Sequence, residues 1–199
     1  MRKSGVSDYE AFARALLAVV PDRPISFEVF ADDAAEMERQ GRIIAGWGEH
    51  VYVKIPVTNT QGVPTDAALR GLVADGVKVN VTGLMTTDQV RWVADCLAPD
   101  VPACVSVFAG RIADTGVDPV PIMSASLEIL RGLPETELIW ASPRELLNVV
   151  QADAIGCDII TVTHDLLKKL PILGRDLTDY SLDTVRMFHG DAVAAGFTL

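Results

Sequence analysis

Four apolar runs in the chain each carry one polar residue, and these polar residues recur at a fixed spacing of 26 positions. They are Glu28, Lys54, Asn80 and Ser106. A constant period between successive strands places equivalent residues at the same level and pointing to the same side. The spacing therefore predicts a repeating architecture in which four polar side chains gather on one face. The alternative is that the spacing arose by chance.

Short β-branched runs alternate with Ala- and Leu-rich amphipathic stretches along the whole sequence. The predicted strands are 25–30, 51–57, 77–82, 103–108, 138–141 and 158–163. The predicted helices are 8–20, 32–46, 65–75, 87–97, 122–132, 143–154, 164–170 and 181–195. Strands that alternate with helices and are apolar along most of their length are typical of a parallel sheet covered by helices.

Both an open doubly wound sheet and a TIM-type (β/α) barrel satisfy this α/β pattern. In an open sheet, the four polar residues would lie under a layer of helices. In a barrel they line the interior and face one another near the mouth, where barrel chemistry is located. The doubly wound alternative also lacks a glycine-rich G-x-G-x-x-G turn. The sequence therefore favours the barrel.

Length and composition limit the classes of function. The 199 residues fit one domain, 1–199, and the net charge of −10 disfavours nucleic-acid partners. No apolar run approaches the roughly 18 residues of a membrane span, and no secretory signal precedes the first predicted helix. Cys96, Cys104 and Cys157 are isolated from one another and show no metal-ligand spacing, which indicates a reducing, cytoplasmic environment and no metal site.

Lys54 is the unusual residue of the set, because it interrupts the apolar run Val53, Lys54, Ile55. Burial disfavours the charged form of a lysine, and a neutral amine is a nucleophile that forms a Schiff base with a ketone or aldehyde. The protonated imine then acts as an electron sink for breaking or forming a carbon–carbon bond. The alternative is that the Lys54 ammonium reaches water at the barrel mouth.

Helix starts are marked by three Ser/Thr-x-x-Glu/Gln patterns, which are typical of capping boxes. They are Ser7–Glu10, Thr86–Gln89 and Ser142–Glu145. In the third, Ser142 is the expected cap, Pro143 the first helical residue and Arg144 part of the first turn, so we expect a helix to begin there directly after a strand. Free N–H groups at such a helix start, together with Arg144, predict an anion site of the kind that barrels use for phosphate.

Several motifs in order resemble the transaldolase family of class I aldolases, which includes the fructose-6-phosphate-aldolase-like members. They are "ISFEVFAD", "VYVKIPVT", "VKVNVTGLMT", "ACVSVFAGRIAD" and "ASPRELLNVVQADAIGCDIITV". The resemblance covers essentially the whole chain. It implies carbohydrate metabolism of the pentose phosphate type, sugar-phosphate substrates, and no metal or organic cofactor. It also implies a homo-oligomer, for which the segment 181–197 is a candidate interface.

By that resemblance, Lys54 is the Schiff-base lysine, and Glu28 and Thr82 hold a catalytic water. Asn80 and Ser106 match positions that bind substrate hydroxyls, whereas Arg111, Ser142 and Arg144 match phosphate contacts. Phe108 stands where transaldolases carry phenylalanine and the hydrolytic-type aldolases of the family carry tyrosine. The resemblance therefore implies transfer of a dihydroxyacetone unit between sugar phosphates.

The resemblance also implies that the chain begins after the family's first strand and "TTNP" turn, so that about six of the eight barrel strands are present. That first strand carries the aspartate that acts on the C4 hydroxyl during bond cleavage. Three functions therefore stay open. They are a transaldolase, an aldolase that releases free dihydroxyacetone, and a catalytically silent barrel that binds a sugar phosphate or a protein partner.

Overall fold

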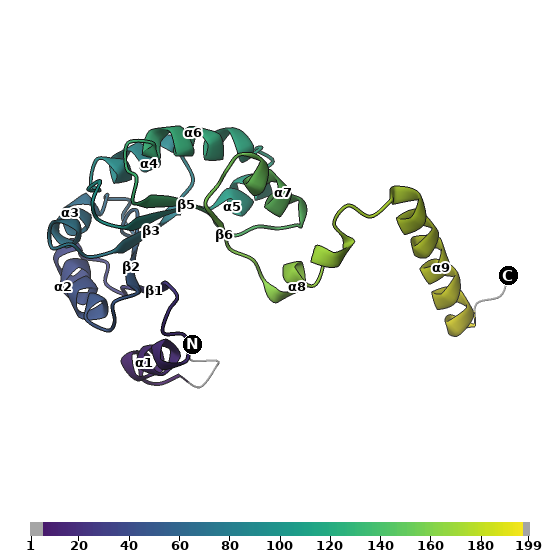
Figure 1. Ribbon diagram of the computed structural model, residues 1–199, viewed down its shortest axis with the longest axis horizontal. Coiled ribbons are helices and arrows are strands. Elements are labelled where there is room, and N and C mark those ends of the chain that lie inside the picture. Colours follow the sequence, from purple (N-terminus) through teal and green to yellow (C-terminus); the bar gives the residue numbers. More distant parts are fainter. Residues whose placement is uncertain (1–5, 197–199) are drawn as a thin grey trace. The chain divides into compact units, whose positions relative to one another are not determined.

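The computed structural model describes residues 6–196 and divides into two compact units, Met1–Thr161 and Val162–Leu199 (Figure 1). The first unit holds the sheet and all the residues that the sequence singles out as a site. The prediction of one domain over 1–199 stays a prediction.

The first unit contains a six-stranded parallel sheet whose strands follow one another in sequence order. The strands are β1 (Ile25–Glu28), β2 (Val51–Pro56), β3 (Val79–Leu84), β4 (Ala103–Val107), β5 (Thr136–Trp140) and β6 (Ile159–Ile160). Parallel neighbours joined each time by a helical crossover form a singly wound sheet, which curls as a half-barrel. The predicted α/β barrel architecture with about six strands is therefore confirmed, and the doubly wound alternative is excluded.

The helices of this unit cover one side of the sheet, and all but the first lie between successive strands. They are α1 (Tyr9–Val19), α2 (Ala34–Ala45), α3 (Asp66–Ala74), α4 (Thr87–Ala94), α5 (Ala109–Asp114), α6 (Val120–Leu130) and α7 (Leu147–Ala154). Figure 1 shows α2, α3, α4 and α6 in an arc along the outside of the curled sheet. The short helix α5 lies in a stretch that the sequence left without a predicted element.

The two faces of the sheet differ in what they bury. On the helix-covered face, Val53, Ile55, Val81 and Val105 are fully buried and belong to the main hydrophobic core. The opposite, concave face carries a small separate cluster of Cys104, Ile139 and Ala141, with Tyr52, Phe108 and Ile159 packed against it. Each fully buried aliphatic side chain contributes about 1.5–3 kcal/mol. The helix-covered face therefore supplies most of the packing energy, and the concave face is left for polar groups.

Capping explains where several helices begin. Thr86 and Gln89 form the predicted capping box at the start of α4, with both reciprocal hydrogen bonds present. At α1 the prediction is wrong by one residue, because Asp8 rather than Ser7 is the N-cap, and its carboxylate accepts from the Ala11 N–H at 3.0 Å. An ionised carboxylate is the stronger acceptor at a helix start, since it also complements the helix dipole.

The second unit contains α8 (His164–Leu167), the 3₁₀ helix η2 (Leu170–Ile172) and α9 (Leu177–Ala195). Helix α9 begins four residues before the predicted start at 181, because the Asp176 carboxylate caps it by accepting from the N–H groups of Thr178 and Asp179. Residue 197, the end of the predicted interface segment, lies outside the described residues. Within residues 6–196, no helix combines the length and the apolar character that crossing a bilayer requires.

Candidate active site

The strand register brings three of the four evenly spaced polar residues side by side. Glu28 pairs in register with Lys54, and Lys54 pairs in register with Asn80. The prediction is wrong for Ser106, because the register partner of Asn80 on β4 is Cys104. Ser106 lies two residues further along β4 and therefore still points to the same face. The four side chains thus share the concave face, with Ser106 displaced towards the carboxyl end of its strand.

A chain of hydrogen bonds joins three strands across this face. The Ser106 hydroxyl donates to Asn80 Oδ1 at 2.8 Å, and Asn80 Nδ2 donates to Ser26 Oγ at 2.9 Å. Asn80 and Ser106 are buried. Since Ser26 lies on β1 and Asn80 on β3, their contact spans the strand that carries Lys54. Sequence reasoning missed Ser26, although its place two residues before Glu28 puts it on the same face of β1.

Lys54 lies on the strand between these groups. Its neighbours Val53 and Ile55 are fully buried on the helix-covered face, whereas Lys54 points to the concave face and is half-buried. Among the described residues, its amine makes no ion pair and no hydrogen bond. The predicted enclosure is only partial, because within the described part of the chain β1 pairs only with β2 and β6 only with β5, so the sheet does not close into a full barrel.

Two further predicted residues lie at the carboxyl ends of β1 and β3. The Glu28 carboxylate is exposed, while its backbone N–H donates to the Tyr9 hydroxyl at 3.0 Å. Thr82 is buried, and its Oγ1 finds no hydrogen-bond partner in the described part of the chain. A buried hydroxyl without a protein partner is costly and is usually satisfied by water or ligand. Thr82 therefore offers a donor and an acceptor on the face that carries Lys54.

The one thiol of the small cluster on this face is not in its reactive form. Cys104 is buried on β4 beside Asn80, and burial raises the pKa of its thiol to about 12. Because the thiolate is the reactive form of cysteine, Cys104 stays protonated and inert at neutral pH. In residues 6–196, no cluster of three or more His, Cys, Asp or Glu side chains could hold a metal ion.

The loops that follow β1 and β2 are joined by one carboxylate. Asp32 accepts hydrogen bonds from the N–H of Thr60 at 2.7 Å and from its hydroxyl at 2.6 Å. Both bonds lower the pKa of Asp32, and the bond from the Thr60 hydroxyl has the larger effect. Asp32 follows the Glu28 strand and Thr60 follows the Lys54 strand. The contact therefore ties together the two loops nearest the candidate acid and the candidate nucleophile.

Phe108 and Arg111 lie where β4 passes into α5. Phe108 is half-buried against the small cluster on the concave face, and the Arg111 guanidinium lies 5.2 Å from the centre of the Phe108 ring. A cation over an aromatic face is attracted by about 0.5–1 kcal/mol at an exposed site. Arg111 is exposed, so its donors stay accessible beside the ring.

The predicted helix start at Ser142 is wrong. Helix α7 begins at Leu147, and Ser142 adopts a left-handed conformation with φ 61°, its N–H donating to the Thr161 hydroxyl at 3.2 Å. The Asn148 side chain accepts from the N–H groups of Arg144 and Glu145 at 2.8 and 3.2 Å. These N–H groups are therefore already satisfied, and Ser142 is not the N-cap, because α7 begins at Leu147 with Leu146 as its N-cap residue.

Arg144 is held by a carboxylate on the neighbouring helix. Its Nε donates to Asp114 Oδ1 at 3.0 Å, and its Nη2 contacts the second oxygen of Asp114. Asp114 lies on α5 three residues after Arg111. The structure thus brings both predicted arginines to the same pair of connections, after β4 and β5. An anion bound there must compete with Asp114 for Arg144.

Gly110 makes this close approach of the two connections feasible. Its N–H donates to the Ala141 carbonyl at 3.2 Å. A Cβ atom at Gly110 would lie 1.5 Å from the carbonyl oxygen of Ser142 and 2.6 Å from its carbonyl carbon. Only a residue without a side chain fits, so Gly110 allows α5 to pack directly against the Ser142 segment.

Comparison with known proteins identifies similar sequences and one similar structure. Residues 9–198 match the family model described as Transaldolase/Fructose-6-phosphate aldolase. A "Probable transaldolase" of Dehalococcoides mccartyi is 34% identical over 178 residues, covering 89% of this chain and 78% of that protein. A "Probable transaldolase" of Methanococcus maripaludis is 34% identical over 184 residues, covering 92% and 80%. The solved structure described as "Native KDPGal structure" aligns with a TM-score of 0.38 and 12% identity, covering 81% of this chain and 80% of that one.

Proposed function

The chain belongs to the transaldolase/fructose-6-phosphate aldolase family, and from that premise we propose that it transfers a dihydroxyacetone unit between sugar phosphates through a Schiff base on Lys54. The observation that carries the proposal is the placement of Lys54. It is an amine without a partner among the described residues, in register with both Glu28 and Asn80 on the concave face.

Imine formation needs one nucleophile and one proton relay. The Lys54 amine attacks the ketone carbon of the sugar, and the carbonyl oxygen takes up a proton to give a carbinolamine. Loss of that oxygen as water leaves the protonated imine, so a proton must be delivered to the departing hydroxyl. Glu28 and the Thr82 hydroxyl, acting through a bound water, supply it. The unpartnered Thr82 Oγ1 and the exposed Glu28 carboxylate support this role.

The remaining predicted residues bind and orient the sugar phosphate. Asn80 and Ser106 contact substrate hydroxyls, and their mutual hydrogen bond keeps both groups ordered before substrate binds. Arg111 and Arg144, beside Ser142, take the phosphate, whose higher charge competes with the single carboxylate of Asp114 for the Arg144 guanidinium. The ordered Asn80 amide, and the two arginines on the connections after β4 and β5, support a substrate with hydroxyls at one end and phosphate at the other.

We expect fructose 6-phosphate to become covalently attached to Lys54 when borohydride is added. Reduction of the imine adds two hydrogens, so the chain gains the mass of the sugar phosphate less one oxygen atom. If the carbon–carbon bond is cleaved before reduction, the gain is that of dihydroxyacetone less one oxygen atom. Peptide mapping by mass spectrometry identifies the modified residue. A sample reduced without sugar is the control, and a chain that stays unmodified contradicts the proposal.

Substitution of Phe108 by tyrosine tests transfer against release of free dihydroxyacetone. A tyrosine hydroxyl binds water where the phenylalanine ring excludes it, so we expect the product ratio to move severalfold towards free dihydroxyacetone. The ratio is measured by assaying dihydroxyacetone and the transferred sugar phosphate in one reaction. Phe12→Tyr, at an exposed position of α1, is the matched control. An unchanged ratio in Phe108→Tyr contradicts the role given to Phe108.

A further inference from the structure

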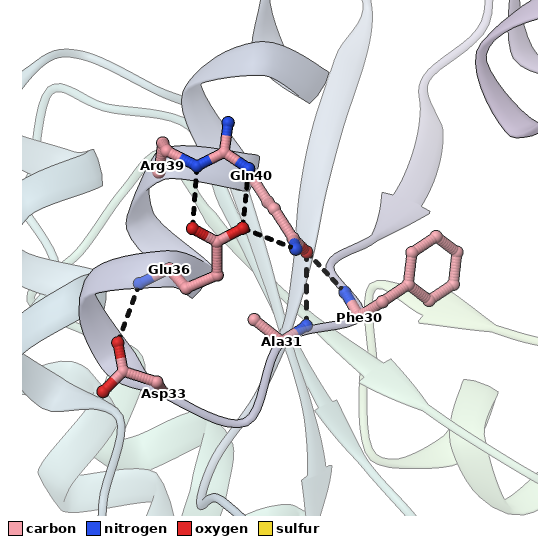
Figure 2. Close-up of polar contacts among 6 residues, drawn as sticks. All are labelled: Phe30, Ala31, Asp33, Glu36, Arg39 and Gln40. Carbon is pink, nitrogen blue, oxygen red and sulfur yellow. Dashed lines mark hydrogen bonds and ion pairs between the residues drawn. The ribbon is translucent and has the colours of Figure 1, made fainter.

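The Gln40 side chain reaches from α2 to the backbone that follows β1. Its Oε1 accepts hydrogen bonds from the N–H of Phe30 at 2.8 Å and from the N–H of Ala31 at 3.2 Å (Figure 2). Both donors lie within three residues of Glu28, the last residue of β1. Gln40 is not needed as a helix cap, because Asp33 already caps α2 by accepting from the Glu36 N–H. Its bonds hold the loop before the helix instead.

A second contact fixes which way the Gln40 amide points. Its Nε2 donates to Glu36 Oε1 at 3.1 Å, and Arg39 holds both oxygens of that carboxylate at 2.6 and 2.7 Å (Figure 2). Hydrogen bonds from the Arg39 guanidinium, which has the largest effect, and from the Gln40 amide lower the pKa of Glu36 to about 2. The carboxylate therefore stays ionised at neutral pH. A flipped amide would place its oxygen against this carboxylate and its N–H₂ against two N–H groups, so the amide has one satisfied orientation.

The backbone around Glu28 is held at each neighbouring position. The Glu28 N–H donates to the Tyr9 hydroxyl, and the Val29 N–H donates to the Lys54 carbonyl at 3.0 Å. The next two N–H groups, of Phe30 and Ala31, donate their hydrogen bonds to Gln40 Oε1. Glu28 itself is exposed, and its carboxylate takes part in no ion pair within residues 6–196. Its position is therefore set by the backbone and not by contacts of its own side chain.

We propose that Gln40 is a positioning residue for Glu28, holding the end of β1 so that the Glu28 carboxylate stays next to Lys54. The inference rests on the proposed function, in which Glu28 relays the protons of imine formation. Gln40 touches neither substrate nor Lys54. It acts only through the backbone at Phe30 and Ala31.

The test compares two variants in the full-length chain. Gln40→Met keeps the length of the side chain and removes both loop contacts. The double variant Glu36→Gln with Gln40→Glu exchanges the two groups, so a carboxylate again accepts from the loop and an amide again donates to it. We expect Gln40→Met to lower kcat for transfer from fructose 6-phosphate about ten-fold with KM nearly unchanged, because a small displacement of a catalytic group is costly. The exchanged pair restores kcat to within about three-fold of the original chain.

Two further measurements separate positioning from a loss of stability. Amide hydrogen exchange at Phe30 and Ala31 should quicken in Gln40→Met and slow again in the exchanged pair. Arg131→Met, which removes an exposed ion pair with Glu128 on α6, is the control and should leave kcat unchanged. Suppose that the original chain is active, and that Gln40→Met leaves kcat unchanged although the Phe30 and Ala31 amides exchange faster. That result overturns the positioning role of Gln40 and leaves the proposed function standing. An original chain that forms no Lys54 adduct overturns the proposed function.

Discussion

Substitution of Lys54 by methionine is expected to abolish both borohydride-trapped adduct and sugar-phosphate transfer. Removal of a covalent nucleophile leaves no other amine in register with Glu28 and Asn80, so the rate should fall at least about ten-thousand-fold. The fold should survive, because the half-buried Lys54 amine makes no ion pair within residues 6–196 and methionine keeps a similar length of apolar chain. Mass spectrometry after reduction, together with a coupled transfer assay, measures the two losses.

Lys78→Met is the matched control for this substitution. Lys78 immediately precedes β3, and its amine donates to the Glu49 carbonyl at 2.8 Å, away from the register of Lys54. We expect Lys78→Met to retain both adduct and transfer. If Lys54→Met still yields a sugar adduct on another lysine and still turns over, the Schiff base has been assigned to the wrong residue.

Substitution of Gly110 by alanine is expected to have the largest effect on stability. The added Cβ would overlap the carbonyl oxygen of Ser142 at 1.5 Å, and this neighbour is backbone rather than a side chain that can turn away. Either α5 or the Ser142 segment must move, which should lower the free energy of unfolding by about 3 kcal/mol or more. For a chain of this length, the corresponding fall in Tm is about 10 °C.

The same substitution should weaken substrate binding in whatever protein remains folded. Arg111 and Asp114 follow Gly110 on α5, so displacement of this helix separates the Arg111 guanidinium from that of Arg144. We expect a raised KM for the sugar phosphate, measured alongside thermal unfolding. Gly132→Ala is the control, since a Cβ there meets no atom within 4 Å. Equal stability of the two variants would contradict the prediction, because it would show that the Ser142 segment can move away from the added Cβ without a loss of stability.

The parts of the fold that follow from local pattern were predictable from the sequence. Each β-branched run forms a strand at or near its predicted place, because burial against helices favours these residues whatever lies further along the chain. The spacing of Glu28, Lys54 and Asn80 predicts their register, since the two 26-residue intervals between them equal the offsets of the β1–β2 and β2–β3 pairs. The Thr86–Gln89 capping box is equally local.

Features that depend on contacts between distant segments were not predictable in this way. Ser106 departs from the 26-residue register because β3 and β4 pair with an offset of 24 residues, Val79 with Ala103 and Asn80 with Cys104, so the connection between them is two residues shorter than the spacing requires. The Ser142 segment fails to start a helix because Gly110 and Thr161, 32 residues before and 19 residues after it, hold it in another conformation. Contacts of this kind have no periodic signature in the sequence.

Alternation along each strand has an evolutionary consequence. Odd-numbered positions such as Val53, Ile55 and Val81 maintain the packing with the helices, whereas the even-numbered Lys54, Asn80 and Thr82 carry their polar groups on the concave face. Substitutions at the even-numbered positions should therefore have little effect on the packing between the sheet and the helices. A lineage that keeps this scaffold can change the chemical groups of the concave face by a few substitutions in the second set, and directed evolution should concentrate its libraries there.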